Sequence, residues 1–221
     1  MNLDREFLSK LIGEIIGTFT IIFVGCGTVM MASLFPASYN LGIVAITFGL
    51  VVAAMIYTLG HVSGAHFNPA VTAAFCSIKR FPLNRMLFYW AAQIIGAVLA
   101  IALLSFLVPE TQTFGETVPS VAPFQALVWE IIITFFLMFV VMGVATDSRA
   151  VGAMAGATIG ATIMFTVIVS APLTGASMNP ARSFAPALFK GDLSHMGIYF
   201  FGPLIGAIAA AKIYNFIRHE T

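Results

Sequence analysis

Long apolar stretches with few charges constrain the fold of this chain more than any other feature of its sequence. A helix that spans a bilayer needs about 20 mostly apolar residues, and six segments meet that length: 8–34, 40–60, 84–108, 121–145, 150–170 and 195–217. Of the 221 residues, 60% are hydrophobic and 9% are charged, whereas soluble domains average about 25% charged residues. Because backbone groups in lipid must be hydrogen-bonded within the chain, segments of this length are expected to be helices. The sequence therefore predicts an all-α membrane protein, a single domain over 1–221.

Two further apolar segments, 62–80 and 171–190, are too interrupted to span. Each is short and broken by Gly, Pro and Asn, and apolar stretches of about 10–14 residues are more often re-entrant than spanning. Irregular backbone at membrane depth is tolerated where protein buries it or where it lines a water-filled cavity. We therefore expect six transmembrane helices plus two re-entrant half-helices, with the re-entrant segments forming the wall of a pore.

Both re-entrant segments contain the triplet Asn-Pro-Ala, as Asn68, Pro69 and Ala70 in SGAHFNPAVT and as Asn179, Pro180 and Ala181 in TGASMNPARS. An Asn side chain can cap a helix, and Pro suits the first helical position. Each triplet is therefore expected to open a half-helix with its positive dipole end at the Asn. Capping by the side-chain oxygen leaves the amide N–H₂ group to donate to a passing oxygen. Two ordinary Asn-Pro turns are the alternative.

The two halves of the chain resemble each other. GEIIGTFTIIF at 13–23 aligns with WEIIITFFLMF at 129–139, and QIIGAV at 93–98 aligns with PLIGAI at 203–208. Each half has three predicted spans, and an odd number turns the second half upside down relative to the first. We therefore expect an inverted 3+3 repeat, residues 1–110 and 120–221, with the functional site at the repeat interface near the midplane.

Glycines recur every four residues in several spans, at 13 and 17, at 152, 156 and 160, and at 202 and 206. Small residues on one helix face allow close packing in lipid. We expect these faces to be helix contacts.

The distribution of Lys and Arg predicts the orientation. An even number of spans places both termini on the same side of the membrane. The basic residues on that side are Arg5, Lys10, Lys79, Arg80, Arg85, Arg149, Lys212 and Arg218, whereas the other side has only Arg182 and Lys190. The loop 109–120 carries Glu110 and Glu116 and no basic residue. Cytoplasmic loops are enriched in Lys and Arg. The sequence therefore predicts a multi-pass protein of the cell membrane with cytoplasmic N- and C-termini.

The doubled Asn-Pro-Ala, with Arg182 directly after the second copy, resembles the aquaporins of the major intrinsic protein family over essentially the whole chain. The resemblance implies a bundle of six spanning helices and two half-helices, one pore per subunit and a homotetramer in the lipid bilayer. It also implies that Arg182 belongs to a selectivity filter, with Phe48, Val167 and Ala176. Arg at membrane depth costs about 2.5–3.5 kcal/mol on insertion scales, so we expect this side chain to face a cavity.

The resemblance assigns roles to further polar groups. It implies that Glu14 and Glu130 are structural carboxylates that accept N–H bonds from the re-entrant loops; a proton relay is the alternative. His66 resembles a pore-side residue of the family, whereas His61 is expected to pack or to hydrogen-bond a loop. The pore carbonyls are expected from Gly64, Ala65, His66, Gly175, Ala176 and Ser177.

The filter departs from both specialised patterns of the family. Strict water channels that resemble this chain have His in place of Val167, and Val cannot donate a hydrogen bond. Glycerol-selective members have Trp in place of Phe48, a second aromatic residue in place of Ala176, and Asp in place of Ser183. Ser183, Ala187, Tyr199 and Phe200 are closer to the water channels. The filter is therefore predicted to be wide and apolar, as in archaeal and plant-type members.

These features predict a passive channel for water and small uncharged solutes (glycerol, ammonia or dissolved gases) that excludes protons and ions. One alternative is an aquaglyceroporin-type facilitator for a small neutral solute. Another is an ion-coupled secondary transporter, for which Glu14 and Glu130 are the candidate coupling groups. We expect no enzyme activity, because the spans lack a Ser–His or paired-Asp constellation. We expect no cofactor, no metal site and, at a net charge of +1, no nucleic-acid partner.

Overall fold

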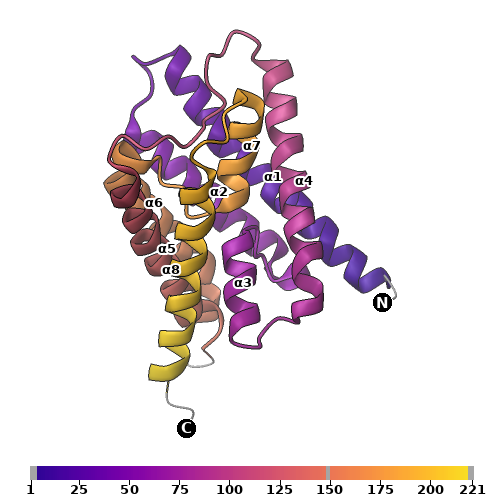
Figure 1. Cartoon of the computed structure of the whole chain (residues 1–221). Helices are drawn as coiled ribbons and strands as arrows, with labels where there is room; N and C mark the ends of the chain where they lie inside the picture. Colours follow the sequence, from indigo (N-terminus) through magenta and orange to yellow (C-terminus); the bar gives the residue numbers. More distant parts are fainter. Residues whose placement is uncertain (1–3, 148–149, 219–221) are drawn as a thin grey trace.

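The computed structural model describes residues 4–147 and 150–218, and it is entirely helical over these ranges (Figure 1). Six helices are long and apolar enough to cross a membrane: α1 (Arg5–Leu34), α2 (Leu41–Ser63), α4 (Leu83–Leu107), α5 (Pro123–Ala145), α6 (Ala155–Thr174) and α8 (Met196–Ile217). The two short helices α3 (Pro69–Ser77) and α7 (Pro180–Lys190) lie in the segments expected to be re-entrant. The predicted all-α membrane fold is confirmed.

Several predicted helix boundaries were wrong by three to five residues, most clearly in α1 and α6. α1 begins at Arg5 rather than near residue 8, because the Asp4 side chain accepts a hydrogen bond from Phe7 N at 2.7 Å and caps a polar first turn. The span predicted at 150–170 begins at Ala155, after a 3₁₀ turn over Gly152–Met154, and continues to Thr174. Apolar length alone locates neither a polar cap nor a turn of another helix type.

The contacts between helices repeat in the two halves. α1 packs against α2 and α4, and α5 packs against α6 and α8 in the same way. Each half-helix also crosses to the other half, since α3 packs against α8 and α7 packs against α4. In Figure 1, α3 occupies the lower level of the bundle and α7 the upper level. The half-helices therefore enter from opposite ends.

Glycines allow the long helices to touch at their backbones. A Cβ atom added at Gly96 would lie 2.4 Å from the Ile15 carbonyl oxygen, and one at the repeat-related Gly206 would lie 2.2 Å from that of Ile131. Gly156, Gly160, Gly202 and Gly206 make the expected helix contacts, but Gly152 does not: it lies in the 3₁₀ turn, and a Cβ there would meet nothing within 4 Å.

The described chain begins and ends toward the same end of the bundle, the lower end in Figure 1. The α3–α4 connection, which carries Lys79 and Arg80, lies at that end, and the α1–α2 and α4–α5 connections lie at the other. Arg149, which the sequence analysis grouped with Lys79 and Arg80, lies outside the described residues.

Candidate pore and selectivity filter

The two Asn-Pro-Ala triplets open helices as the sequence predicts. Asn68 Oδ1 accepts a hydrogen bond from Ala70 N at 2.8 Å, and Asn179 Oδ1 accepts one from Ala181 N at 3.0 Å. Pro69 and Pro180 occupy the first helical positions of α3 and α7. Both helices therefore direct their N-terminal, positive ends at the junction between them.

Each capping Asn also bonds to the opposite half of the chain. Asn68 Nδ2 donates to the Met178 carbonyl at 2.7 Å, and Asn179 Nδ2 donates to the Phe67 carbonyl at 2.9 Å. The expectation that the whole amide group is available to a passing molecule was therefore wrong, because the carbonyl preceding the other Asn takes one N–H. A primary amide has two N–H donors, so one remains on each Asn.

The loops before the triplets share an unusual backbone. Besides Gly64 and Gly175, four non-glycine residues have positive φ angles: Ala65 (51°), Phe67 (49°), Ala176 (48°) and Met178 (52°). A non-glycine residue in this left-handed region costs roughly 1–2 kcal/mol. Because both loops adopt this unfavourable conformation, each needs stabilising hydrogen bonds. The two buried glutamates, Glu14 and Glu130, accept them.

Glu14 is fully buried and accepts four hydrogen bonds. Its Oε1 receives Ser63 Oγ at 2.7 Å and His66 N at 3.0 Å, and its Oε2 receives Phe67 N at 2.7 Å and Gln93 Nε2 at 2.8 Å. The carboxylate thus satisfies two successive backbone N–H groups of the first loop.

Glu130 does the same in the second half. Its Oε1 receives Thr174 Oγ1 at 2.8 Å and Ser177 N at 2.9 Å, and its Oε2 receives Met178 N at 2.9 Å. Both glutamates are absent from the residues that line the cavity described below. Their partners are backbone N–H groups of the loops and side chains of the neighbouring helices, which fits a structural role and leaves a proton relay without a path to the cavity.

The direction of these N–H groups determines the direction of the carbonyls. In a planar trans peptide, the C=O points opposite to the N–H of the next residue. The N–H groups of residues 65–67 and 176–178 bond to the two glutamates or to the Ser63 and Thr174 hydroxyls beside them. The carbonyls of residues 64–66 and 175–177 therefore point away from the glutamates.

A cavity of about 520 Å³ is lined by residues of both halves. Of the six residues expected to supply carbonyls, all but Gly175 line it. Asn68 and Asn179 line it as well, whereas the fully buried Ala70 and Ala181 and the buried Pro69 and Pro180 do not. The junction of the half-helices is therefore part of the cavity wall.

All four residues expected to form a filter line this cavity. Phe48 comes from α2, Val167 from α6, Ala176 from the second loop and Arg182 from α7. The guanidinium carbon of Arg182 lies 5.3 Å from the centre of the Phe48 ring, a cation–π geometry. The family resemblance thus grouped side chains from four separate segments that line one cavity.

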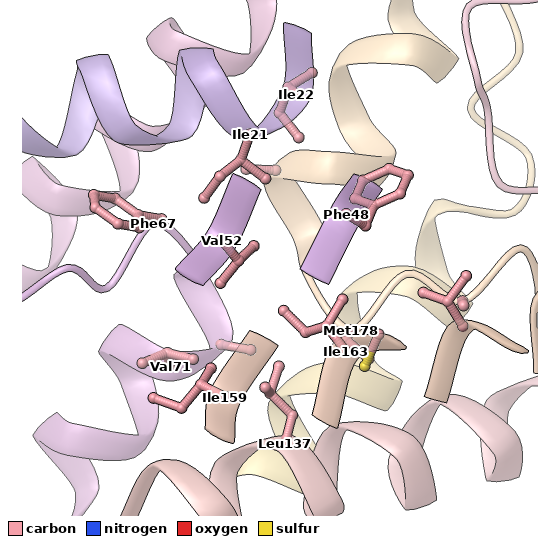
Figure 2. Packing of buried hydrophobic residues seen from close by; sticks show 14 of the residues in the cluster. Ile21, Ile22, Phe48, Val52, Phe67, Val71, Leu137, Ile159, Ile163 and Met178 are labelled. Carbon is pink, nitrogen blue, oxygen red and sulfur yellow. The ribbon is translucent and has the colours of Figure 1, made fainter. Parts of the chain in front are cut away.

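Apolar side chains dominate the rest of the wall. Six such residues, drawn in Figure 2, come from α1, α2, α3, α5 and α6, and each belongs both to the buried hydrophobic cluster and to the cavity lining: Ile21, Val52, Val71, Leu137, Ile159 and Ile163. The wall therefore combines loop carbonyls and Asn amides with apolar side chains that offer water no hydrogen bonds.

Two features of the site, the partner of Arg182 and the place of His61, were not predicted from the sequence. The Gly115 carbonyl, in the α4–α5 connection, accepts a hydrogen bond from Arg182 Nη1 at 2.6 Å. No motif marks this glycine, although its φ of 75° lies in the left-handed region that favours glycine. His61 was expected to be a packing or loop histidine, but it is exposed and lines the cavity beside Tyr57 and Gly60. His66 lines the cavity as expected.

Comparisons with known proteins agree with this arrangement. The sequence matches the family described as Major intrinsic protein over residues 3–214. It is 47% identical to Nodulin-26 of Glycine max, over 96% of this chain and 79% of that protein, and 47% identical to Aquaporin NIP1-1 of Oryza sativa subsp. japonica, over 96% and 75%.

A solved structure shows the same fold. The X-ray structure of the aquaglyceroporin from Plasmodium falciparum superposes with a TM-score of 0.88, covering 95% of this chain and 96% of that one at 24% sequence identity. With a family match over nearly its full length and relatives at 47% identity, the chain belongs to the major intrinsic protein family.

Proposed function

We propose that this protein is a passive transmembrane channel for water and small uncharged solutes. One observation carries the proposal: the ends of two half-helices, held together by reciprocal Asn-to-carbonyl hydrogen bonds, form part of the wall of a cavity that both halves line. Discontinuous helices that meet at a repeat interface are a recurrent way to build a membrane transport site. The family comprises channels rather than enzymes, and the names of the relatives, aquaporin and aquaglyceroporin, indicate the same class of solute.

The loop carbonyls and the two Asn amides are proposed to guide water molecules that pass through the pore in single file. The carbonyls of residues 64–66 and 175–177 supply acceptors, and Asn68 and Asn179 each supply one remaining N–H donor at the junction. A water oxygen that accepts from both amides turns its hydrogens outward, which interrupts a continuous hydrogen-bonded chain of waters. The positive helix ends act in the same direction, and Arg182 adds an electrostatic barrier. Protons and cations are therefore excluded.

The filter is proposed to admit more than water. Phe48, Val167 and Ala176 present apolar surfaces, and Arg182 presents hydrogen-bond donors. Such a ring suits a molecule with a polar edge and an apolar face, which describes glycerol, and it offers no obstacle to ammonia or dissolved gases. The alternative, an aquaglyceroporin-type facilitator whose main substrate is a small neutral solute, rests on the same three apolar side chains.

An ion-coupled transporter would need a charged coupling site on the permeation path. Glu14 and Glu130 are the candidates, and both carboxylates are fully buried and accept hydrogen bonds from the loop backbone and from helix side chains. These observations support the passive channel over coupled transport.

The proposed setting is the cell membrane, with both termini cytoplasmic and the chain assembled as a homotetramer with one pore per subunit. The distribution of Lys and Arg supports the orientation. The repeats are proposed to be residues 1–110 and 120–221, joined by the α4–α5 connection.

A pair of osmotic experiments on purified protein in liposomes tests the proposal. Stopped-flow shrinkage is measured first with an impermeant osmolyte and then with glycerol. The proposal predicts fast shrinkage in both, followed by protein-dependent re-swelling in glycerol. Shrinkage no faster than that of empty liposomes would contradict the channel. Fast shrinkage without re-swelling would contradict the wide filter while leaving the water channel intact.

A further inference from the structure

The connection between the two halves lies along α7, the half-helix that carries Arg182. Thr117 Oγ1 donates to Ser183 Oγ at 2.7 Å, Arg182 Nη1 donates to the Gly115 carbonyl at 2.6 Å, and Lys190 Nζ donates to the Gln112 carbonyl at 2.7 Å. Ser183 and Lys190 are seven residues apart, about 10 Å along a helix. Residues 112–117 therefore follow α7 from its last residue to the filter arginine.

Among the described residues, the Gly115 carbonyl holds the Arg182 guanidinium by accepting a hydrogen bond from it. Arg182 is 6% exposed, and its other N–H donors are the polar edge of the proposed filter. Gly115 itself is tightly packed, since a Cβ added there would lie 3.1 Å from Cys26 Cβ on α1. The position of this one carbonyl consequently sets where the guanidinium lies in the cavity.

Glu116 closes the turn that presents this carbonyl. Its Oε2 accepts from Thr113 Oγ1 at 2.7 Å and from Phe114 N at 2.8 Å, and Gly115 N donates to Thr113 Oγ1 at 3.0 Å. Its Oε1 lies 3.7 Å from Lys190 Nζ, with the Glu116 side chain only 13% exposed. The Glu116 carboxylate thus stabilises the turn by hydrogen bonds within it and also links the turn to Lys190 at the end of α7.

The charges around this carboxylate agree with a fixed, ionised group. Burial raises the pKa of Glu116, but the hydrogen bonds from Thr113 and Phe114 and the charge of Lys190 outweigh it, so the pKa lies below its usual value. Asp192, His195 and Tyr199 line the same small recess of about 80 Å³ beside Glu116 and Lys190. In the described structure, Lys190 is the basic group that pairs with the Glu116 carboxylate.

We propose that Glu116 and Lys190 are positioning residues for the filter: together they hold the Gly115 carbonyl against Arg182 and thereby set the selectivity between water and larger neutral solutes. This inference rests on the proposed channel function. Neither side chain lines the main cavity, so both act on the solute through Arg182. We call the Glu116–Lys190 pair the clasp. Without it, the Arg182 guanidinium can move, which changes the width of the filter and the direction of its N–H donors.

Four variants in liposomes test the proposal, with the glycerol-to-water permeability ratio as the readout. Glu116→Gln removes the charge, and Lys190→Met removes the donor to Gln112 and the partner of Glu116. Each is expected to shift the ratio about two- to tenfold, the factor that one hydrogen bond is worth. Lys190→Arg keeps both charge and donor and is expected to restore the ratio. Glu110→Gln makes the same charge change on an exposed residue of the same connection and is expected to leave the ratio unchanged.

Every outcome bears on the clasp separately from the channel. Water conduction by the unaltered protein tests the channel itself. If Glu116→Gln and Lys190→Met conduct with an unaltered ratio, the clasp is overturned and the channel stands. A proportional fall in both permeabilities would also overturn it, because it indicates less folded protein rather than a changed filter. If Glu116→Gln does not fold, Lys190→Met alone decides the question.

Discussion

Glu130→Gln is predicted to destabilise the protein more than Glu14→Gln, although the two residues are repeat-related. In the second half, a Gln at position 130 keeps one acceptor oxygen and turns an N–H₂ group toward the backbone N–H of Met178, which now bonds to Glu130 Oε2 at 2.9 Å. Two donors then face each other in a fully buried site.

The first half contains a side chain that can respond to the same change. Gln93 Nε2 donates to Glu14 Oε2 at 2.8 Å, and Gln93 Oε1 is buried without a hydrogen-bond partner among the described residues. Rotation of the Gln93 amide presents that oxygen to the new N–H₂ group of Glu14→Gln. The repeat-related position in the second half is Pro203, which cannot respond in this way.

The expected loss in free energy of unfolding follows from the hydrogen bonds lost and the buried donors left unsatisfied. Losing a hydrogen bond to a charged group costs about 1.5–3 kcal/mol, and leaving a buried donor unsatisfied costs about 1–3 kcal/mol, so Glu130→Gln should lower the free energy of unfolding by about 3–5 kcal/mol. Glu14→Gln should cost about 1 kcal/mol less. Rotation of Gln93 exchanges its hydrogen bond to Glu14 for one from the new N–H₂ group to Gln93 Oε1, so the new donor is satisfied there, whereas it stays unsatisfied at position 130.

Denaturant or thermal unfolding of the purified variants in one detergent measures the difference. Repeating Glu14→Gln in a Gln93→Leu background removes the compensating amide, and its cost should then rise to that of Glu130→Gln. Equal losses of unfolding free energy in Glu14→Gln and Glu130→Gln would refute the reasoning. So would a smaller loss for Glu14→Gln that remains when Gln93 is replaced by Leu.

Three further predictions concern the filter and the packing. Val167→His should narrow the filter and reduce glycerol permeability about tenfold or more while water still passes; unaltered glycerol re-swelling would count against the position given to Val167. Arg182→Val should raise proton permeability, measured with a pH-sensitive dye inside the vesicles, because it removes the positive charge from the wall; an unchanged leak would show that Arg182 is not part of the proton barrier. Gly206→Ala brings a Cβ to 2.2 Å from the Ile131 carbonyl oxygen and should destabilise the protein by about 1–3 kcal/mol. Gly197→Ala, where nothing lies within 4 Å, should not, and equal melting temperatures for these two variants would contradict the packing argument.

The sequence was sufficient for the helices and for most of the candidate site. Apolar length predicts spans because lipid leaves the backbone few alternatives, and the duplicated triplet predicts the half-helices because Asn and Pro act locally at helix starts. Phe48, Val167 and Arg182 could be grouped because the family resemblance supplied distances that no local rule contains.

What the sequence did not predict depends on tertiary contacts. Asn68 and Asn179 each direct one N–H to a carbonyl of the opposite half, which capping rules for a single helix do not include. Gly115 lies in a connection without a motif, and its partner Arg182 is distant in the chain. The position of Gly152 was misjudged because a spacing of four residues does not distinguish a 3₁₀ turn from the helix that follows it.

The central claim is that neutral molecules pass while protons do not, and one paired measurement on the same vesicles tests it. Water permeability is taken from stopped-flow shrinkage, and proton permeability is taken from the internal pH after an external pH step. We predict shrinkage many times faster than in empty liposomes together with a proton leak equal to theirs. Shrinkage at the rate of empty liposomes, or a proton leak that grows with the amount of protein, would contradict the account.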